Sequence, residues 1–167
     1  YQCLNACEDL CSKLKSDAAS RPGRFLYYPG LTEAERKLVE QNPKEAIVVF
    51  VQKTRAEMSS SRIFPSQRFN DEGDAFRHFM WSGLVTKELG VERAKSYLDA
   101  HETDLAQPPA ERSMDELNNE MGQMAARSLS AKGEWSIPDL EREGLKALKK
   151  KKLRVLNPGL TVPEEVL

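Results

Sequence analysis

Most apolar residues in this chain recur at helical spacing, and we expect the rest of the chain to be organised around residues 71–90. In a helix over this segment, Phe76 and Leu84 lie on one broad side, while Trp81 and Val85 lie on the other. A helix that is apolar almost all round leaves little surface for water and is typical of the centre of a domain. The pattern therefore predicts a buried core helix around which the other helices pack.

The other predicted helices follow from apolar periodicity and from residues that suit helix ends. Thr32 with Glu35, and Ser113 with Glu116, have the spacing of capping boxes at helix starts. The predicted helices span residues 2–17, 32–41, 43–58, 71–90, 91–102, 113–131 and 136–152, with connections at 59–70 and 103–112.

Length and composition place these helices in one domain. The chain has 167 residues, of which 40% are hydrophobic, and this suits a single core. We expect one all-α domain of six or seven helices. Its parts are a cysteine-bearing helix within residues 1–20, a core at 70–130 that carries the candidate site, and an extended tail at 153–167.

The helix predicted from Ser113 has an apolar side that is rich in methionine. Met114, Met121 and Met124 share this side, and we expect them to pack in the core. On the same helix Asn118 falls at the edge of the inward side, whereas Asn119 is expected to point away from it.

The charge balance gives no global bias toward a nucleic-acid or anionic-membrane partner, because the chain has 25 Lys and Arg residues and 26 Asp and Glu residues. No run of residues approaches the ~18 to 20 apolar residues of a membrane span. The chain opens at Tyr1 with no initiator Met and no signal-like segment, so its N-terminus looks processed. This permits a secreted or periplasmic location.

The three cysteines, Cys3, Cys7 and Cys11, would form one stripe on the first predicted helix. Their odd number leaves at least one thiol unpaired within the chain. Three interpretations stay open: a small apolar stripe that docks the helix, one disulfide or intermolecular bridge, and a metal site.

The central helix also carries polar residues that are costly to bury. Asp74 and His78 lie one turn apart on the side of Trp81, and Arg77 lies beside them. A carboxylate, an imidazole and a guanidinium in a core must pair with one another or take part in chemistry. We therefore take this cluster as the main indication of function, with a core histidine bonded to Asp74 as the structural alternative.

The chain has two histidines, and both are predicted to face inward from successive helices. His78 lies twelve residues before Gly90, and His101 lies eleven residues after it. If the two helices pack antiparallel from a turn at Gly90, the two rings lie at the same height and can line one pocket. Glu102 follows His101 directly.

Two kinds of chemistry fit these groups. His78, His101, Asp74 and Glu102 could bind a divalent metal such as zinc, which would generate hydroxide near neutral pH. Without metal, a carboxylate-oriented histidine could act as the base that activates water. The sequence contains no HExxH, GxSxG, P-loop or dinucleotide fingerprint.

Three stretches, at residues 73–81, 100–102 and 114–122, resemble the pattern DAFRHxxW … HE … MDxxNNxxG. The pattern is similar to that of an uncharacterised all-helical domain at the C-terminal end of secreted bacterial proteins, including polymorphic-toxin-like ones. The resemblance implies export and action on another cell or on the envelope. It marks Asp74, Arg77, His78, Trp81, His101, Glu102, Asp115, Asn118, Asn119 and Gly122.

Together these observations predict a secreted or periplasmic hydrolase that acts on phospholipid, peptidoglycan or another anionic substrate. His78, His101, Glu102 and Asp74 would be catalytic, and Arg77 would hold an anionic group. The substrate would also contact Asp115, Asn118, Asn119 and Trp81. The alternative is a non-catalytic helical binding or interaction module in which the buried polar network only fixes the fold.

Overall fold

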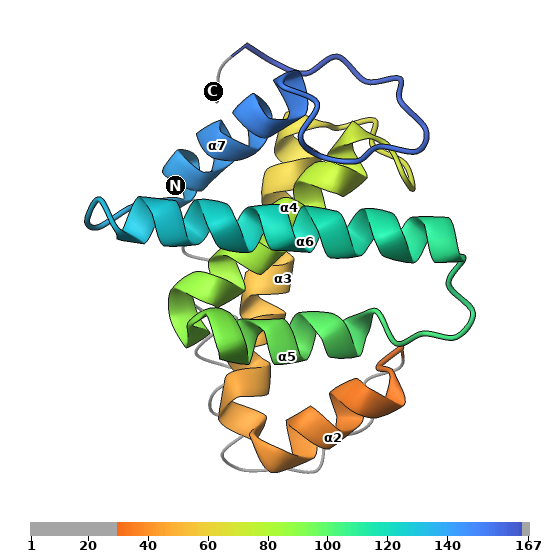
Figure 1. The fold of residues 1–167 in the computed structure, drawn as a ribbon, viewed down its shortest axis with the longest axis vertical. Helices are drawn as coiled ribbons and strands as arrows, with labels where there is room; N and C mark the ends of the chain where they lie inside the picture. Colours follow the sequence, from red (N-terminus) through yellow and green to blue (C-terminus); the bar gives the residue numbers. More distant parts are fainter. Residues whose placement is uncertain (1–29, 165–167) are drawn as a thin grey trace.

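The computed structural model describes residues 30–164, and in this part of the chain the fold is all-α (Figure 1). The predicted helix at 2–17 and the arrangement of the three cysteines lie outside the described residues. The six described helices are α2 (Glu33–Gln41), α3 (Pro43–Ile63), α4 (Glu72–Leu89), α5 (Val91–His101), α6 (Pro109–Ser130) and α7 (Ile137–Lys149). The predicted all-α domain is confirmed.

Helix α4 is the central helix, as predicted. Every residue from Gly73 to Thr86 is buried except Arg77. It packs against α3, α5, α6 and α7, and α6 crosses in front of it in Figure 1. The carboxylate of Asp71 caps its first turn by accepting from two backbone N–H groups, and Gly90 ends it with a φ of 78°. The position of α4 fixes the site, because His78 lies on it.

A glycine sets the distance between α4 and α6. A Cβ atom at Gly122 of α6 would lie 2.1 Å from the Phe79 backbone oxygen and 2.1 Å from the Ser82 hydroxyl of α4. Only a residue without a side chain allows the two backbones to come this close. The polar residues one and two turns before Gly122 are thereby held against α4.

The helix 32–41 was predicted correctly, whereas the predicted end of the next helix was wrong. Thr32 and Glu35 form the expected capping box at α2. Helix α3 continues past residue 58 to Ile63. Its last turn is held by tertiary hydrogen bonds, because Ser59 donates to Glu141 at 2.6 Å and Ser60 donates to the Gly73 backbone oxygen at 2.7 Å. Such distant partners leave no local sequence signal.

The predicted start and inward side of α6 also need correction. The helix begins at Pro109, one turn before the predicted capping box, because a proline at the first helical position needs no N–H partner. Met124 is 54% exposed, whereas Asn118 and Asn119 are buried. The inward side is therefore rotated toward the polar residues, and Asn119 points in rather than away.

The chain after α7 returns to the start of α4. The predicted start of α7 is confirmed by a capping box between Ser136 and Asp139. The extended tail then packs Leu153 into the core, and the backbone N–H groups of Leu156 and Asn157 both donate to the Asn70 backbone oxygen. The tail thus braces the turn that leads into α4. Among the residues described, no helix is long and apolar enough to cross a bilayer.

Candidate functional site

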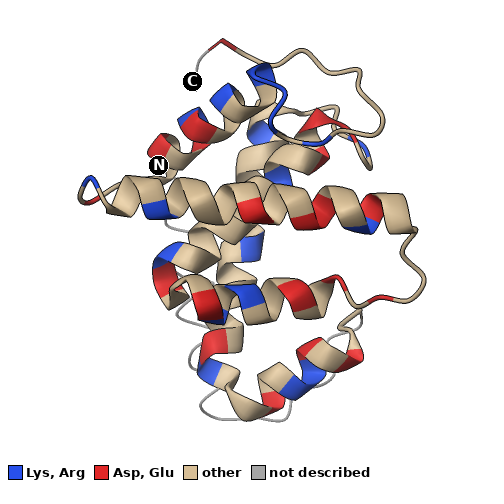
Figure 2. Ribbon diagram, in the orientation of Figure 1, with Lys and Arg blue, Asp and Glu red and all other residues tan. Residues whose placement is uncertain are grey.

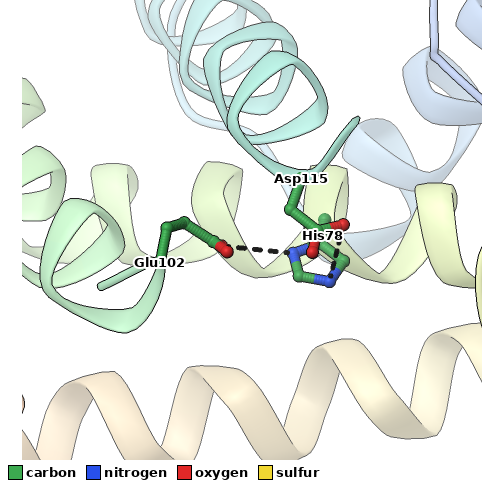
Figure 3. Close-up of side chains that lie close together, drawn as sticks. All are labelled: His78, Glu102 and Asp115. Atoms are coloured by element: carbon green, nitrogen blue, oxygen red, sulfur yellow. Dashed lines mark ion pairs between the residues drawn. The ribbon is translucent and has the colours of Figure 1, made fainter. Parts of the chain in front are cut away.

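His78 lies at the centre of the candidate site, on the face of α4 that meets the ends of α5 and α6 (Figure 3). The residue is only 3% exposed. Arg77 Nη2 lies 2.9 Å from its Nε2 atom, and Asp115 Oδ1 of α6 lies 3.3 Å from the same atom. On the other side of the ring, Nδ1 lies 3.9 Å from Glu102 Oε1. The imidazole is therefore placed between two carboxyl groups from different elements.

Asp74 and Arg77 form the edge of the site one turn before His78. Asp74 Oδ1 accepts from Arg77 Nη2 at 2.5 Å and from Arg77 Nε at 3.2 Å. The second carboxylate oxygen accepts from the backbone N–H of Asn70 at 2.7 Å. Asp74 Oδ1 lies 3.8 Å from His78 Nε2, so this aspartate orients the histidine mainly through Arg77.

Glu102 is the first residue after α5 and is 4% exposed. Its carboxylate accepts from the amide nitrogen of Asn119 at 3.1 Å. A carboxylate at the C-terminal end of a helix gains nothing from the helix dipole, whose negative end lies there. The fold therefore places Glu102 beside His78 at an energetic cost.

Asp115 lies on the inward side of α6 and is held from the α5–α6 connection. Gln107 of that connection donates its amide N–H to Asp115 Oδ2 at 2.7 Å. The other oxygen of Asp115, Oδ1, faces the ring of His78. Close approach at Gly122, two turns further along α6, keeps this part of the helix against α4.

Burial shifts the pKa of all three central groups. Burial, and next the positive charge of Arg77, hold the pKa of His78 well below its usual 6.5, so the ring is neutral near pH 7. Burial raises the pKa of Asp115 to about 8, with further contributions from Glu102 and Asp74. Burial also raises the pKa of Glu102, although His101, Gln107 and Asn119 partly offset this. With a pKa of about 8, Asp115 can therefore hold a proton near neutral pH.

Several buried polar atoms at the site have no hydrogen-bond partner within residues 30–164. They include His78 Nδ1, Asp115 Oδ1, Asn119 Oδ1 and Gln107 Oε1. Folded proteins satisfy nearly all such atoms, because an unpaired buried polar group costs free energy. Their concentration around one histidine indicates a place built to contact something beyond these side chains.

A pocket of about 210 Å³ opens onto the cluster, and both His78 and His101 line it. Its wall is acidic, since one lining residue carries a guanidinium, Arg77, and five carry carboxyl groups: Asp74, Glu102, Asp104, Glu111 and Asp115. Figure 2 shows the acidic residues of α6 gathered in its first half. Glu102 and Asn119 also line a groove of about 800 Å³ along α5 and α6, which gives the cluster a second approach.

His101 lines the pocket but has a partner of its own. Its Nδ1 atom lies 2.8 Å from Glu35 Oε1 of α2, and its ring packs edge-on against Trp81 with centroids 4.9 Å apart. Burial raises the pKa of Glu35, but hydrogen bonds from His101 and the Thr32 backbone, with the charges of His101 and Lys53, together outweigh burial, so the pKa is lowered. His101 thus ties α2 to α5 at the rim of the pocket. Trp81 is buried behind it, where its indole N–H donates to the Val49 backbone oxygen.

Asn118, predicted to contact substrate, is occupied elsewhere in the structure. Its amide nitrogen donates to the Arg154 backbone oxygen at 3.0 Å, and its oxygen accepts from the Arg154 N–H at 2.9 Å. It is therefore a tether for the tail. The sequence reasoning did not identify Gln107 or the Glu35 partner of His101 as part of the site. Gln107 lies in a connection without periodicity, and Glu35 was identified only as a capping residue.

The side chains best placed for a metal ion differ from the predicted set. One ligand atom each from His78, Glu102 and Asp115 lie within 4.8 Å of one another. Of the predicted ligands, this group contains His78 and Glu102. The other two predicted ligands are not part of this group, because His101 pairs with Glu35 and Asp74 pairs with Arg77.

Comparison with known families finds a match for most of the chain. The family model described as a domain of unknown function (DUF6973) matches residues 36–151, which include His78, Glu102 and Asp115. The predicted resemblance to an uncharacterised domain is confirmed to that extent, and the link to secreted toxin-like proteins stays a prediction. No curated protein sequence and no solved structure matches the chain.

Proposed function

We propose that this chain, which belongs to the DUF6973 family, is a hydrolase in which the His78 cluster activates a water molecule. The observation that carries the proposal is the unpaired Nδ1 atom of a buried histidine, 3.9 Å from Glu102 Oε1 on the wall of a pocket. This separation is too long for a direct hydrogen bond. It is short enough for one water molecule to contact both atoms.

The neighbouring groups give each atom a role. Because Arg77 Nη2 donates to Nε2, the neutral ring of His78 carries its hydrogen on Nδ1. In our proposal Nδ1–H holds the water oxygen, and the Glu102 carboxylate takes the water proton as that oxygen attacks the substrate. Asp115, whose pKa burial raises to about 8, donates a proton to the leaving group. Glu102 gains one proton and Asp115 loses one, so the total number of protons on the two carboxyl groups stays the same.

The acidic wall of the pocket restricts the substrate. We expected an anionic substrate held by Arg77, which lines the pocket with its side chain 22% exposed. However, Arg77 is already engaged by Asp74 and His78. Five carboxyl-bearing residues around it would repel a free anion when they are ionised. An anionic substrate therefore fits this proposal only when a cation neutralises part of the wall.

The cellular setting in the proposal comes from sequence resemblance. Export, and an envelope substrate such as phospholipid or peptidoglycan, follow from the similarity to domains of secreted bacterial proteins. The groove along α5 and α6 supports an extended substrate. Glu102 and Asn119 line this groove, and Glu102 also lines the pocket beside His78. A long molecule in the groove would therefore pass the proposed base.

One observation favours the alternative, a non-catalytic binding or interaction module. Part of the polar network is structural: Asn118 tethers the tail through two hydrogen bonds, and Asp74 accepts from the Asn70 backbone. If the whole network were structural, replacing His78 would lower the stability of the fold, with no activity to lose. The unpaired atoms at His78 favour the hydrolase, because a network that only fixes the fold would satisfy them.

The test compares the purified chain with His78→Gln on phospholipid vesicles and on isolated peptidoglycan, with released products identified by mass spectrometry. We expect hydrolysis of one of the two substrates, and a rate at least about 100-fold lower in His78→Gln. The matched control is Glu88→Gln, an exposed residue of the same helix that lies away from the site. Absence of products from both substrates, or equal rates in His78→Gln and wild type, would contradict the proposal.

A further inference from the structure

We infer that the space between His78, Glu102 and Asp115 binds a divalent transition-metal ion. These three side chains come from α4, the end of α5 and α6, and one ligand atom of each lies within 4.8 Å of the others (Figure 3). Ligand atoms about 2.1 Å from a tetrahedral ion lie roughly 3.4 Å from one another, so each side chain would need to shift by less than ~1 Å. The site is therefore nearly formed without the ion.

A second and independent observation points to a ligand at this place. His78 Nδ1 and Asp115 Oδ1 are buried and have no hydrogen-bond partner among the described residues, and the same is true of Asn119 Oδ1 beside Glu102. Imidazole nitrogen, carboxylate oxygen and amide oxygen are all metal-binding atoms. A bound cation would satisfy groups that the side chains leave unpaired.

The charges at the site also suit a divalent cation. When ionised, Asp74, Glu102 and Asp115 carry three negative charges, and Arg77 supplies one positive charge against them. The remaining charge of −2 lies within the buried part of the site, and Glu102 also faces the negative end of the α5 dipole. A divalent ion would neutralise this excess, which no described side chain at the site does.

The ligand types favour a transition metal such as zinc over calcium or magnesium, because one ligand is an imidazole. Binding through Nδ1 moves the ring hydrogen to Nε2, so Arg77 Nη2 must withdraw from that atom. Arg77 can do this while its Nε atom keeps the contact with Asp74 at 3.2 Å. The inference deepens the proposed hydrolytic site, since zinc acidifies a bound water and its charge would let an anionic substrate enter the acidic pocket. The binding itself does not depend on hydrolysis.

The test is calorimetric titration of the metal-stripped 167-residue chain with Zn²⁺, with Ca²⁺ in a parallel titration. Cys3→Ser, Cys7→Ser and Cys11→Ser are combined in every sample, because thiols would bind zinc themselves. We expect one Zn²⁺ per chain, much weaker Ca²⁺ binding, and a rise in Tm with Zn²⁺. Glu102→Gln and Asp115→Asn should each weaken Zn²⁺ binding at least 10-fold, whereas Glu88→Gln should leave it unchanged.

Absence of stoichiometric Zn²⁺ binding overturns the inference, and so does binding that Glu102→Gln and Asp115→Asn leave unchanged. Circular dichroism of each variant verifies that it is folded, and the wild-type titration decides the question if a variant is not. Hydrolysis that persists fully after metal removal would overturn the role of the ion in the reaction, whereas the titration alone decides whether the ion binds. Zinc binding without hydrolysis of either substrate would overturn the proposed function and leave the metal site.

Discussion

Asp115 Oδ1 lies 3.3 Å from His78 Nε2, yet it has no hydrogen-bond partner among the described residues. The second oxygen of the carboxyl group is held by Gln107. A carboxyl group buried in this way favours its neutral form, which is why burial raises the pKa of Asp115 to about 8. This relationship links the chemistry proposed for the site to the stability of the fold.

The first prediction concerns the pH dependence of stability in metal-free protein. A carboxyl group whose pKa rises from 3.8 to about 8 on folding binds a proton more tightly in the folded chain. Its contribution is fully present below pH 3.8 and is lost as pH rises toward 8. We expect Asp115 to lower the free energy of unfolding by up to about 1.4 kcal/mol per pH unit in this window.

Asp115→Asn removes this titration and should flatten the loss of stability between pH 5 and pH 8. Urea unfolding at several pH values, in the presence of a chelator, measures the slope. Glu88→Gln, an exposed carboxyl residue of α4, should keep the wild-type slope. An Asp115→Asn variant with the wild-type slope would mean that Asp115 is ionised in the folded chain at neutral pH.

Part of the site followed from the sequence because it depends on local periodicity. The position of His78 on a buried helix, one turn from Asp74, needs only helical spacing and an apolar segment, and α4 has both. The inward direction of Asn119 was predicted wrongly for a physical reason. The inner side of α6 also contains buried polar residues and a glycine, which the apolar periodicity does not mark. Met114 is buried and Met121 packs against the core as predicted, but Met124 is exposed and Asn119 takes an inward position.

The contacts that could not be predicted join residues far apart in sequence. Glu35 and His101 are separated by 66 positions, and the tail residue Arg154 meets Asn118 across 36. Such pairs depend on how the helices pack, and a single sequence contains no signal for the packing of two particular polar side chains. Gln107 is hidden for another reason, since connections have no periodicity that indicates a direction.

The second prediction tests the close approach of α4 and α6. In Gly122→Ala the new methyl group would lie 2.1 Å from the Phe79 backbone oxygen, and a backbone atom in a buried helix cannot easily move away. We expect a loss of about 3 kcal/mol or more in the free energy of unfolding, at the upper end for overpacked cores. Thermal and urea unfolding measure the loss.

Gly159→Ala is the matched control, because no atom lies within 4 Å of a Cβ built there. It should change stability by less than about 0.5 kcal/mol, as exposed substitutions usually do. If Gly122→Ala is as stable as Gly159→Ala, the two helices must be further apart than in this structure.

The third prediction separates a tether from a substrate contact at Asn118. Asn118→Ala removes both hydrogen bonds to the Arg154 backbone. The backbone N–H and C=O groups of Arg154 then lose these partners. We expect a loss of about 1–3 kcal/mol in the free energy of unfolding. We also expect faster cleavage by trypsin at the tail, next to Lys152 or Arg154, measured by mass spectrometry. Unchanged cleavage with reduced hydrolysis would assign Asn118 to substrate binding instead.

The last prediction concerns His101, which the sequence placed among the catalytic residues and the structure places against Glu35. His101→Gln changes the hydrogen-bonded contact with Glu35 that ties α2 to α5, so we expect a loss of about 1–2 kcal/mol in the free energy of unfolding near pH 7. Burial alone would raise the pKa of Glu35 above 4.5, but hydrogen bonds and charge, those from His101 first among them, together lower it. A lowered carboxyl pKa contributes stability above pH 4.5 that is lost as pH falls through the folded value. The loss of unfolding free energy in His101→Gln should therefore become smaller as the pH falls through the pKa of Glu35 in the folded chain.

Glu35→Gln tests the same pair from the other side, and the double variant should cost clearly less than the sum of the two single variants. Urea unfolding at pH 7 and in acid gives the coupling free energy and its pH dependence. Hydrolysis rates give the second readout: we expect His101→Gln to slow the reaction far less than His78→Gln, because Glu35 already occupies Nδ1 of His101. A rate as low as that of His78→Gln, with unchanged stability, would show that His101 takes part in the reaction and that Glu35 orients it.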